Sequence, residues 1–239
     1  MTPHELAHEL ERIYQERLKS VVLYGSAAGG DYSKKYSDFN VFCVLEDPSP
    51  SELARANRLI RKWIRKGNPP PHFFDPKHIE TSLDVFPLEF LDIQDQHQVL
   101  LGRDPLEGIS VDHTNLRHQC ESELKGKLLH LRSFYVANCH RPRQIAKMMI
   151  QSFPTFLATF RGALRLLNEK PSRDARRVVE LISQKIDINP QIFLDVIEIR
   201  KGDAILPRGD GALTAFERYL TELEAITRYV DQMQVTEVR

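Results

Sequence analysis

Apolar residues recur every three or four positions near the start of the chain and predict an amphipathic helix over residues 2–19. The apolar stripe consists of Leu6, Leu10, Ile13, Tyr14 and Leu18. Thr2 and Glu5 have the spacing of a capping box, in which each side chain bonds the backbone of the other residue. Pro3 between them suits a first helical turn, where no amide donor is needed.

Two short apolar runs follow this helix. Residues 20–24 are rich in valine and end at Gly25, and residues 38–45 are rich in phenylalanine and valine. Both compositions are typical of β-strands. Residues 49–67 then predict a second helix, with Ser49 and Glu52 as a capping box and Gly67 as its stop.

The rest of the chain divides into a short mixed part and a long helical part. Residues 87–93, "PLEFLDI", are the best remaining strand candidate before residue 110. Beyond it the helical spacing dominates, and helices are predicted over 114–137, 143–168, 172–186, 190–201 and 212–233. We therefore predict an α/β (α+β) domain with a small mixed sheet over residues 1–110 and an all-α helical bundle over 111–239.

Composition changes this picture little. The 239 residues contain 33 basic and 33 acidic side chains, so no overall field favours nucleic acid or a membrane. The three cysteines, Cys43, Cys120 and Cys139, are scattered and fit neither a disulfide framework nor a zinc cluster. No apolar run approaches the roughly 20 residues that span a bilayer. We expect a cytoplasmic protein without membrane or nucleic-acid partners.

One stretch carries candidate chemistry. In "LYGSAAGGDYSKKYSDFNVF" an apolar run ends at Gly25-Ser26, and a second run begins with Asp38 and Asn40. Side chains alternate along a strand, so Asp38 and Asn40 share the face opposite Phe39. Two oxygen-bearing side chains in one small volume suit a hard cation such as Mg²⁺. Gly25 lets the backbone approach a ligand, and the Ser26 hydroxyl and nearby amides can hold phosphate oxygens.

This order of residues resembles the signature of the DNA polymerase β-like nucleotidyltransferase superfamily, in which Gly-Ser is followed by Asp-x-Asp/Glu. Here Gly25-Ser26 precedes Asp38-x-Asn40 by a spacer of eleven residues. The resemblance implies that Asp38 and Asn40 bind Mg²⁺ and that Gly25 and Ser26 hold a nucleoside triphosphate. Members of the aminoglycoside-modifying branch also carry a helical bundle after the catalytic domain, and in this respect the chain resembles them.

The resemblance also implies a third carboxylate on a neighbouring strand. The segment "PLEFLDI" points to Glu89 as this metal ligand and catalytic residue, together with the catalytic Asp38. Asp92 lies on the opposite face of the predicted strand and is the alternative. Related enzymes with an appended helical bundle can form dimers, so the resemblance allows a homodimer without requiring one.

Asn40 departs from the family pattern, because the second acid is expected there. An amide oxygen can ligate Mg²⁺, but the substitution removes one negative charge and weakens occupancy of at least one metal site. Two functions therefore remain. The first is Mg²⁺-dependent transfer of a nucleoside monophosphate to an acceptor that the sequence does not name. The second is a nucleotide-binding or regulatory protein that has lost turnover.

Another pattern points to a different enzyme class. Residues 4–8, "HELAH", fit the HExxH motif of zinc proteases. His4 and His8 lie off the apolar stripe of the first helix, and Glu5 is already assigned to the capping box. A zinc site at this position is not expected.

Overall fold

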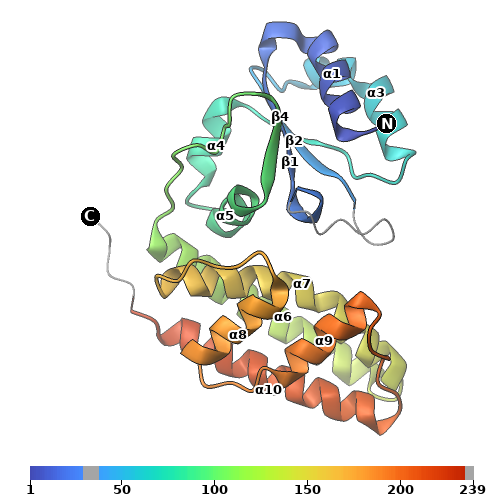
Figure 1. The fold of residues 1–239 in the computed structure, drawn as a ribbon, viewed down its shortest axis with the longest axis vertical. Helices are drawn as coiled ribbons and strands as arrows, with labels where there is room; N and C mark the ends of the chain where they lie inside the picture. Colours follow the sequence, from blue (N-terminus) through green and yellow to red (C-terminus); the bar gives the residue numbers. More distant parts are fainter. Residues whose placement is uncertain (29–37, 235–239) are drawn as a thin grey trace. The chain divides into compact units, whose positions relative to one another are not determined.

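The computed structural model describes residues 1–28 and 38–234 (Figure 1). The chain divides into two compact units, Met1–Val111 and Asp112–Arg239. We call them the N-terminal unit and the helical unit. The first combines a sheet with helices and the second is all-helical, so the predicted fold class is confirmed.

A four-stranded mixed sheet with the order β3-β2-β1-β4 organises the N-terminal unit. Its strands are β1 (Leu18–Tyr24), β2 (Asn40–Leu45), β3 (His72–Phe74) and β4 (His97–Gly102). The central strand β1 pairs antiparallel with both β2 and β4, and β2 pairs parallel with β3. Every residue from Val21 to Leu23 is buried, because both faces of the sheet are covered.

Helices cover the two faces of this sheet (Figure 1). They are α1 (Pro3–Tyr14), α2 (Pro50–Arg55), α3 (Asn57–Ile64), α4 (Pro76–Ser82) and α5 (Pro87–Asp95), with short 3-10 turns η1 (Gln15–Arg17) and η2 (Gly25–Ala27). The helices α1 and α3 lie on one face, and α4 and α5 lie on the other. The sheet is therefore the middle layer of the unit.

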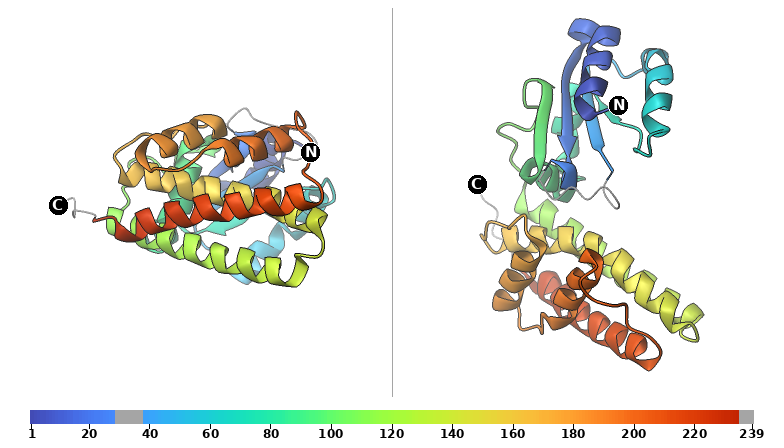
Figure 2. Two further views of the ribbon diagram at one scale, coloured as in Figure 1. Left: turned by 90° about the horizontal axis from the view of Figure 1, so that it is seen from below. Right: turned by 45° about the vertical axis from the view of Figure 1, so that its right-hand side comes forward.

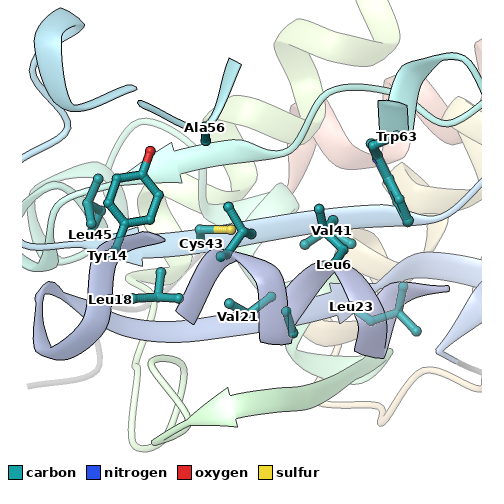
Figure 3. Packing of buried hydrophobic residues seen from close by; sticks show 12 residues of the cluster. Leu6, Tyr14, Leu18, Val21, Leu23, Val41, Cys43, Leu45, Ala56 and Trp63 are labelled. Carbon is teal, nitrogen blue, oxygen red and sulfur yellow. The ribbon is translucent and has the colours of Figure 1, made fainter. Parts of the chain in front are cut away.

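The first face holds the larger apolar cluster (Figure 3). Val41, Cys43 and Leu45 of β2 point into it, as their alternation predicts. Trp63 of α3 is fully buried there, and its indole Nε1 donates to the carbonyl of Pro69 at 2.8 Å. Burial raises the pKa of the Cys43 thiol, so this cysteine packs as a small apolar side chain.

The intervening residues of β2 point to the second face. Phe42 and Val44 pack there with Val22 of β1, Ile79 of α4 and Phe90 of α5. Phe42 and Phe74 meet edge to face with ring centroids 5.8 Å apart. Two-sided burial of β2 explains why its sequence is an almost continuous apolar run.

The predicted strand over residues 87–93 is wrong. These residues begin α5. Pro87 occupies the first turn, and Phe86, Phe90 and Ile93 are spaced four and three residues apart, with Phe90 and Ile93 packed against the second face. Helical spacing therefore outweighs the short alternation, and the strand of this region is β4, directly after the helix.

The predicted capping box at Ser49 is also wrong. Ser49 precedes α2 without a side-chain cap, and its hydroxyl donates to Asp47 at 3.0 Å. Glu52 instead pairs with Arg17 and Arg55, both at 2.8 Å. The predicted single helix is interrupted at Ala56 and forms α2 and α3.

The capping box of α1 is confirmed. The Glu5 amide donates to the Thr2 hydroxyl, and the Glu5 carboxylate accepts from the Thr2 amide at 2.8 Å. Glu5 in "HELAH" therefore has the capping role that the sequence predicts. His8 lies 3.6 Å from Glu11 of the same helix, and its side chain is exposed.

The helical unit contains five helices within its described residues: α6 (His113–Asn138), α7 (Pro142–Leu166), α8 (Ala175–Lys185), α9 (Gln191–Lys201) and α10 (Asp210–Gln232). All five agree with the predicted ranges to within a few residues. The long helices α6, α7 and α10 run alongside one another (Figure 2), and α7 also packs on α8 and α9. No helix in the described part of the chain is long and apolar enough to cross a membrane.

A proline inside α7 is compensated by another helix. Pro154 has no amide hydrogen, so it cannot bond the carbonyl of Ile150 four residues earlier. The guanidinium of Arg200, in α9, donates to this carbonyl oxygen at 3.0 Å. Arg200 therefore supplies the hydrogen bond that the helix itself lacks.

A double-mutant cycle tests this pairing. Arg200→Ala should lower the free energy of unfolding by about 0.5–1.5 kcal/mol, the usual net worth of a hydrogen bond. In a Pro154→Ala background residue 154 regains its amide donor, so the loss from Arg200→Ala should shrink. Denaturant unfolding followed by far-ultraviolet circular dichroism measures both losses. Equal losses in the two backgrounds would show that Arg200 acts elsewhere.

Candidate functional site

The ends of three strands meet at one edge of the sheet. Tyr24 ends β1, Asn40 begins β2 and His97 begins β4. The register pairs Tyr24 with Asn40 on one side and with His97 on the other. Directly paired residues point to the same face, so these three side chains form a row across the sheet.

The chain turns sharply at Gly25, directly after β1. Gly25 has φ +78°, which L-residues rarely adopt, and its amide donates to the carbonyl of Gln96 at 2.8 Å. Its own carbonyl accepts from the Ala28 amide at 2.9 Å and closes η2. A Cβ placed on Gly25 would lie 3.4 Å from Nδ2 of Asn40. The turn and the Asn40 amide, expected to act together, therefore lie side by side.

Asp38 lies just outside β2, because the strand begins two residues later than predicted. Its side chain is exposed. The intervening Phe39 packs on Trp63 with ring centroids 6.1 Å apart, and its amide lies 3.4 Å from the Asn68 side-chain oxygen. Phe39 thus joins the first face, as alternation predicts. Joint ligation of a metal by Asp38 and Asn40 stays a prediction.

Sequence reasoning missed His97. Its Nδ1 lies 2.9 Å from the carbonyl oxygen of Gln94, and its Nε2 lies 3.0 Å from Oδ2 of Asp104. The other carboxylate oxygen of Asp104 accepts from the Leu106 amide at 2.9 Å. These bonds anchor the start of β4 to the loop beyond it. The apolar run after His97 could have indicated a strand that begins at this residue. It was missed because the strand of this region had been assigned to residues 87–93.

Tyr24 lies between Asn40 and His97 in this row. Its ring packs on Phe42 with centroids 5.9 Å apart. Burial raises the pKa of Tyr24, so its phenol stays protonated at neutral pH. It can therefore support neighbouring groups through packing or a hydrogen bond, but not as a base.

The family model described as "Nucleotidyltransferase domain" matches residues 4–89. The matched range contains the Gly25 turn, Asp38 and Asn40. This part of the chain is a nucleotidyltransferase domain. None of the curated proteins matches the chain.

A solved structure extends the likeness to the helical unit. The spectinomycin adenyltransferase AAD(9) from Enterococcus faecialis, crystallised with ATP and spectinomycin, has a TM-score of 0.52 with this chain at 10% sequence identity. The similarity covers 93% of this chain and 100% of AAD(9). At this identity the comparison shows a shared fold.

The expected third carboxylate of the nucleotidyltransferase domain is not on a strand. Glu89 lies exposed in the first turn of α5, and Asp92 lies half-buried three residues later in the same helix. Three residues span nearly one helical turn, so the strand-face argument that separated Glu89 from Asp92 does not apply. The Gly25–Gln96 bond fixes the other end of α5 near the turn. Glu89 is seven residues from Gln96, roughly 10 Å along the helix axis.

The edge strand β3, which pairs with β2, supplies no carboxylate in place of Glu89 or Asp92. β3 consists of His72, Phe73 and Phe74 and has no acidic residue. Within residues 1–28 and 38–234, no group of three or more His, Cys, Asp or Glu side chains is arranged to hold a metal ion. The oxygen donors proposed for a cation at this edge are therefore the Asp38 carboxylate and the Asn40 amide, with Glu89 as a further prediction.

The Gly25 turn can be tested by stability. Gly25→Ala should lower the free energy of unfolding of the N-terminal unit by about 1–2 kcal/mol, because alanine resists a positive φ. Trp63 is the only tryptophan and lies in this unit, so its fluorescence reports the transition.

Gly126→Ala is the matched control. Gly126 lies in α6 with open space around its Cβ position, so alanine should raise the stability of the helical unit by about 0.5–1 kcal/mol. Circular dichroism follows that change. A Gly25→Ala protein as stable as the parent would contradict the strained turn.

Proposed function

We propose that the chain transfers a nucleoside monophosphate from a nucleoside triphosphate to a hydroxyl-bearing small molecule in a Mg²⁺-dependent reaction. The observation that carries this proposal is that the Gly25 turn lies beside Asn40 at the sheet edge of a nucleotidyltransferase domain. A backbone turn suited to phosphate and an oxygen donor suited to a cation lie side by side there. A metal–triphosphate complex needs both.

Each residue has a proposed role at this edge. The backbone at Gly25 approaches the phosphates without a side chain in the way. The side chain of the next residue, Ser26, lies outside what the structure describes, and its hydroxyl stays a predicted phosphate ligand. Asp38 and Asn40 hold the ion through oxygen atoms, the donors that Mg²⁺ prefers. Nδ2 of Asn40 faces Gly25, so Oδ1 is the atom for the metal. Bound Mg²⁺ neutralises charge on the triphosphate.

The transfer itself is a single displacement. The acceptor oxygen forms a bond to the α-phosphorus, and the bond from that phosphorus to the bridging oxygen of the β-phosphate breaks. Pyrophosphate leaves with the electron pair. The acceptor proton passes to a carboxylate base, for which Glu89 or Asp92 is proposed.

The acceptor side is assigned to the helical part. We propose that residues 1–110 and 111–239 are separate domains and that the second selects the acceptor. AAD(9), which shares the fold of this chain, was crystallised with ATP and a small molecule, spectinomycin, and this supports a small-molecule acceptor here. Protein side chains, a tRNA end and another nucleotide are the alternatives that an acceptor screen separates.

Transfer of label from α-³²P-ATP, in the presence of Mg²⁺ and an acceptor panel, tests the reaction. Asp38→Ala should lower product formation by at least about a hundredfold, since a metal–triphosphate complex without its carboxylate loses several kcal/mol of transition-state stabilisation. Asp84→Ala, at an exposed turn residue outside the site, is the control and should retain full activity. Unchanged transfer by Asp38→Ala would refute the assignment.

A second function is favoured by a specific observation. The site has Asn40 where the family carries an acid, and β3 offers no carboxylate beside it. Such a site would bind a nucleoside triphosphate and retain it without turnover. The protein would then use nucleotide occupancy to position a partner.

A charge-restoring variant tests whether the missing acid at position 40 explains the second function. Asn40→Asp adds one carboxylate at the sheet edge and should tighten Mg²⁺ binding in the presence of a non-hydrolysable triphosphate by roughly tenfold. Calorimetry measures this affinity. For the second function, the parent binds triphosphate without product in any screen, and Asn40→Asp tightens the metal. No gain in metal affinity would show that the missing charge is not the cause.

A further inference from the structure

Four residues around β4 form a closed circuit of hydrogen bonds, which we call the His97 network. Nδ1 of His97 lies 2.9 Å from the carbonyl oxygen of Gln94, and Nε2 lies 3.0 Å from Oδ2 of Asp104. The Leu106 amide donates to Oδ1 of Asp104 at 2.9 Å, and the side-chain amide of Gln94 donates to the Leu106 carbonyl at 3.2 Å. The network therefore ties the last turn of α5 to the loop after β4.

Both imidazole nitrogens of His97 face hydrogen-bond acceptors. A carbonyl oxygen and an ionised carboxylate can only accept, so each nitrogen has to donate. A neutral imidazole has one N–H group and can donate from one nitrogen only. The amide of Leu106, which donates to Asp104, favours the ionised form of that carboxylate. Both contacts of His97 are therefore satisfied together only by the imidazolium, paired with the Asp104 carboxylate.

This ion pair is partly shielded from water. The side chains of His97 and Asp104 are 15% and 31% exposed, and salt screens such a pair less than a pair on the surface. Tyr24 lies opposite His97 on β1, and burial raises the pKa of Tyr24, so its phenol is neutral where histidine titrates. Asp95 at the end of α5 and Arg103 after β4 are the charged residues next along the chain, and they carry opposite signs. Within the described residues, the carboxylate bonded to His97 is that of Asp104.

The His97 network surrounds the residue that holds the Gly25 turn. Gln96 lies between Gln94 and His97 in the sequence, and its carbonyl oxygen accepts from the Gly25 amide at 2.8 Å. His97 itself pairs with Tyr24, the residue directly before Gly25. A protonated His97 therefore fixes the segment on both sides of the carbonyl group that holds the turn.

We propose that His97 is a positioning residue for the sheet-edge site and that triphosphate binding weakens when this histidine loses its proton. The inference rests on the proposed nucleotidyl transfer and adds a regulation of the same site by pH. After deprotonation one imidazole nitrogen faces an acceptor without a hydrogen, so the network opens at Asp104 or at Gln94. The carbonyl of Gln96 then loses support, and the Gly25 turn is held less firmly for the phosphates. Histidine is the side chain whose ordinary titration falls in the physiological range.

Asp104→Asn separates the charge of His97 from its packing. Asparagine at this position can accept from the Leu106 amide through Oδ1 and can donate through Nδ2 to an unprotonated Nε2 of His97. A neutral imidazole with its proton on Nδ1 then satisfies both contacts, so the network should stay closed at high pH. His8→Gln is the matched control, because His8 is an exposed histidine 3.6 Å from Glu11, in the same unit and outside the network.

Amide exchange on the full chain reports the Gly25 turn without any ligand. Nitrogen-15 NMR of the imidazole follows the protonation of His97 from about pH 5.5 to about pH 9, a range that brackets histidine titration. The protection factor of the Gly25 amide removes the direct effect of pH on exchange. It should fall at least about tenfold as His97 loses its proton, the size expected for one lost hydrogen bond to a charged group. In Asp104→Asn it should change less than about twofold.

Calorimetry with a non-hydrolysable ATP analogue and Mg²⁺ tests the consequence for binding. Over the same pH range the affinity of the parent should fall at least about threefold more than that of Asp104→Asn, because only the parent loses a bond of the network. Comparing the two proteins cancels the titration of the analogue itself. His8→Gln should follow the parent in both measurements.

The possible results separate this inference from the proposed function. The same pH dependence of Gly25 protection in the parent and in Asp104→Asn would overturn the role of the His97 proton. Loss of protection without a difference in triphosphate affinity would overturn the positioning role and leave the proposed transfer intact. An analogue that binds at no pH, together with no transfer to any acceptor, would refute the proposed function and the positioning role with it.

Discussion

The pairing of β1 with two antiparallel neighbours is the constraint on which the N-terminal unit depends. It brings the end of β1 beside the start of β2 and the start of β4, so Tyr24, Asn40 and His97 form one row. The chain leaves this row through Gly25, whose amide donates to the Gln96 carbonyl and whose Cβ position, empty in glycine, lies beside the Asn40 amide. Apolar clusters on both faces of the sheet hold β1 in register, because a shift by one residue would move each β1 side chain into the cluster on the opposite face. The positions of the residues proposed for metal and phosphate binding therefore depend on that register.

Much of this fold could be predicted where local signals and packing agree. The Thr2 capping box, the strands around Val22 and Val41 and the five long helices each combine a clear period with a matching buried face. The errors occur where a segment is short. Residues 87–93 make only about two helical turns, so the periodic signal is weak. The helix is favoured by Pro87 in its first turn and by the packing of Phe90 and Ile93 on the sheet, which the sequence does not reveal. Ser49 loses its cap to Asp47, a competing local partner.

The candidate site was predictable only in part, for a related reason. Gly25 and Asn40 come together through neighbouring strands, which strand periodicity anticipates. The third carboxylate depends on where α5 lies, and the row containing His97 depends on β4, so both required the correct assignment of residues 87–102. The structure replaces a strand-face choice between Glu89 and Asp92 with two positions on one helix.

Charge distribution separates the two units chemically. The N-terminal unit presents few oxygen ligands at its sheet edge, with Asn40 in place of an acid. The helical unit instead concentrates basic residues, because residues 124–168 of α6 and α7 contain neither Asp nor Glu. An overall charge of zero conceals this contrast. The account therefore places a metal–triphosphate complex at the sheet edge of the N-terminal unit.

Anomalous diffraction most directly tests whether the sheet edge binds a metal–triphosphate complex. Crystals grown with Mn²⁺ in place of Mg²⁺ and with a non-hydrolysable ATP analogue locate the metal by its anomalous signal. The account predicts a peak in direct contact with oxygen atoms of Asp38 and Asn40, with the triphosphate against the backbone of Gly25. A triphosphate bound elsewhere, or a metal that touches neither side chain, would contradict it.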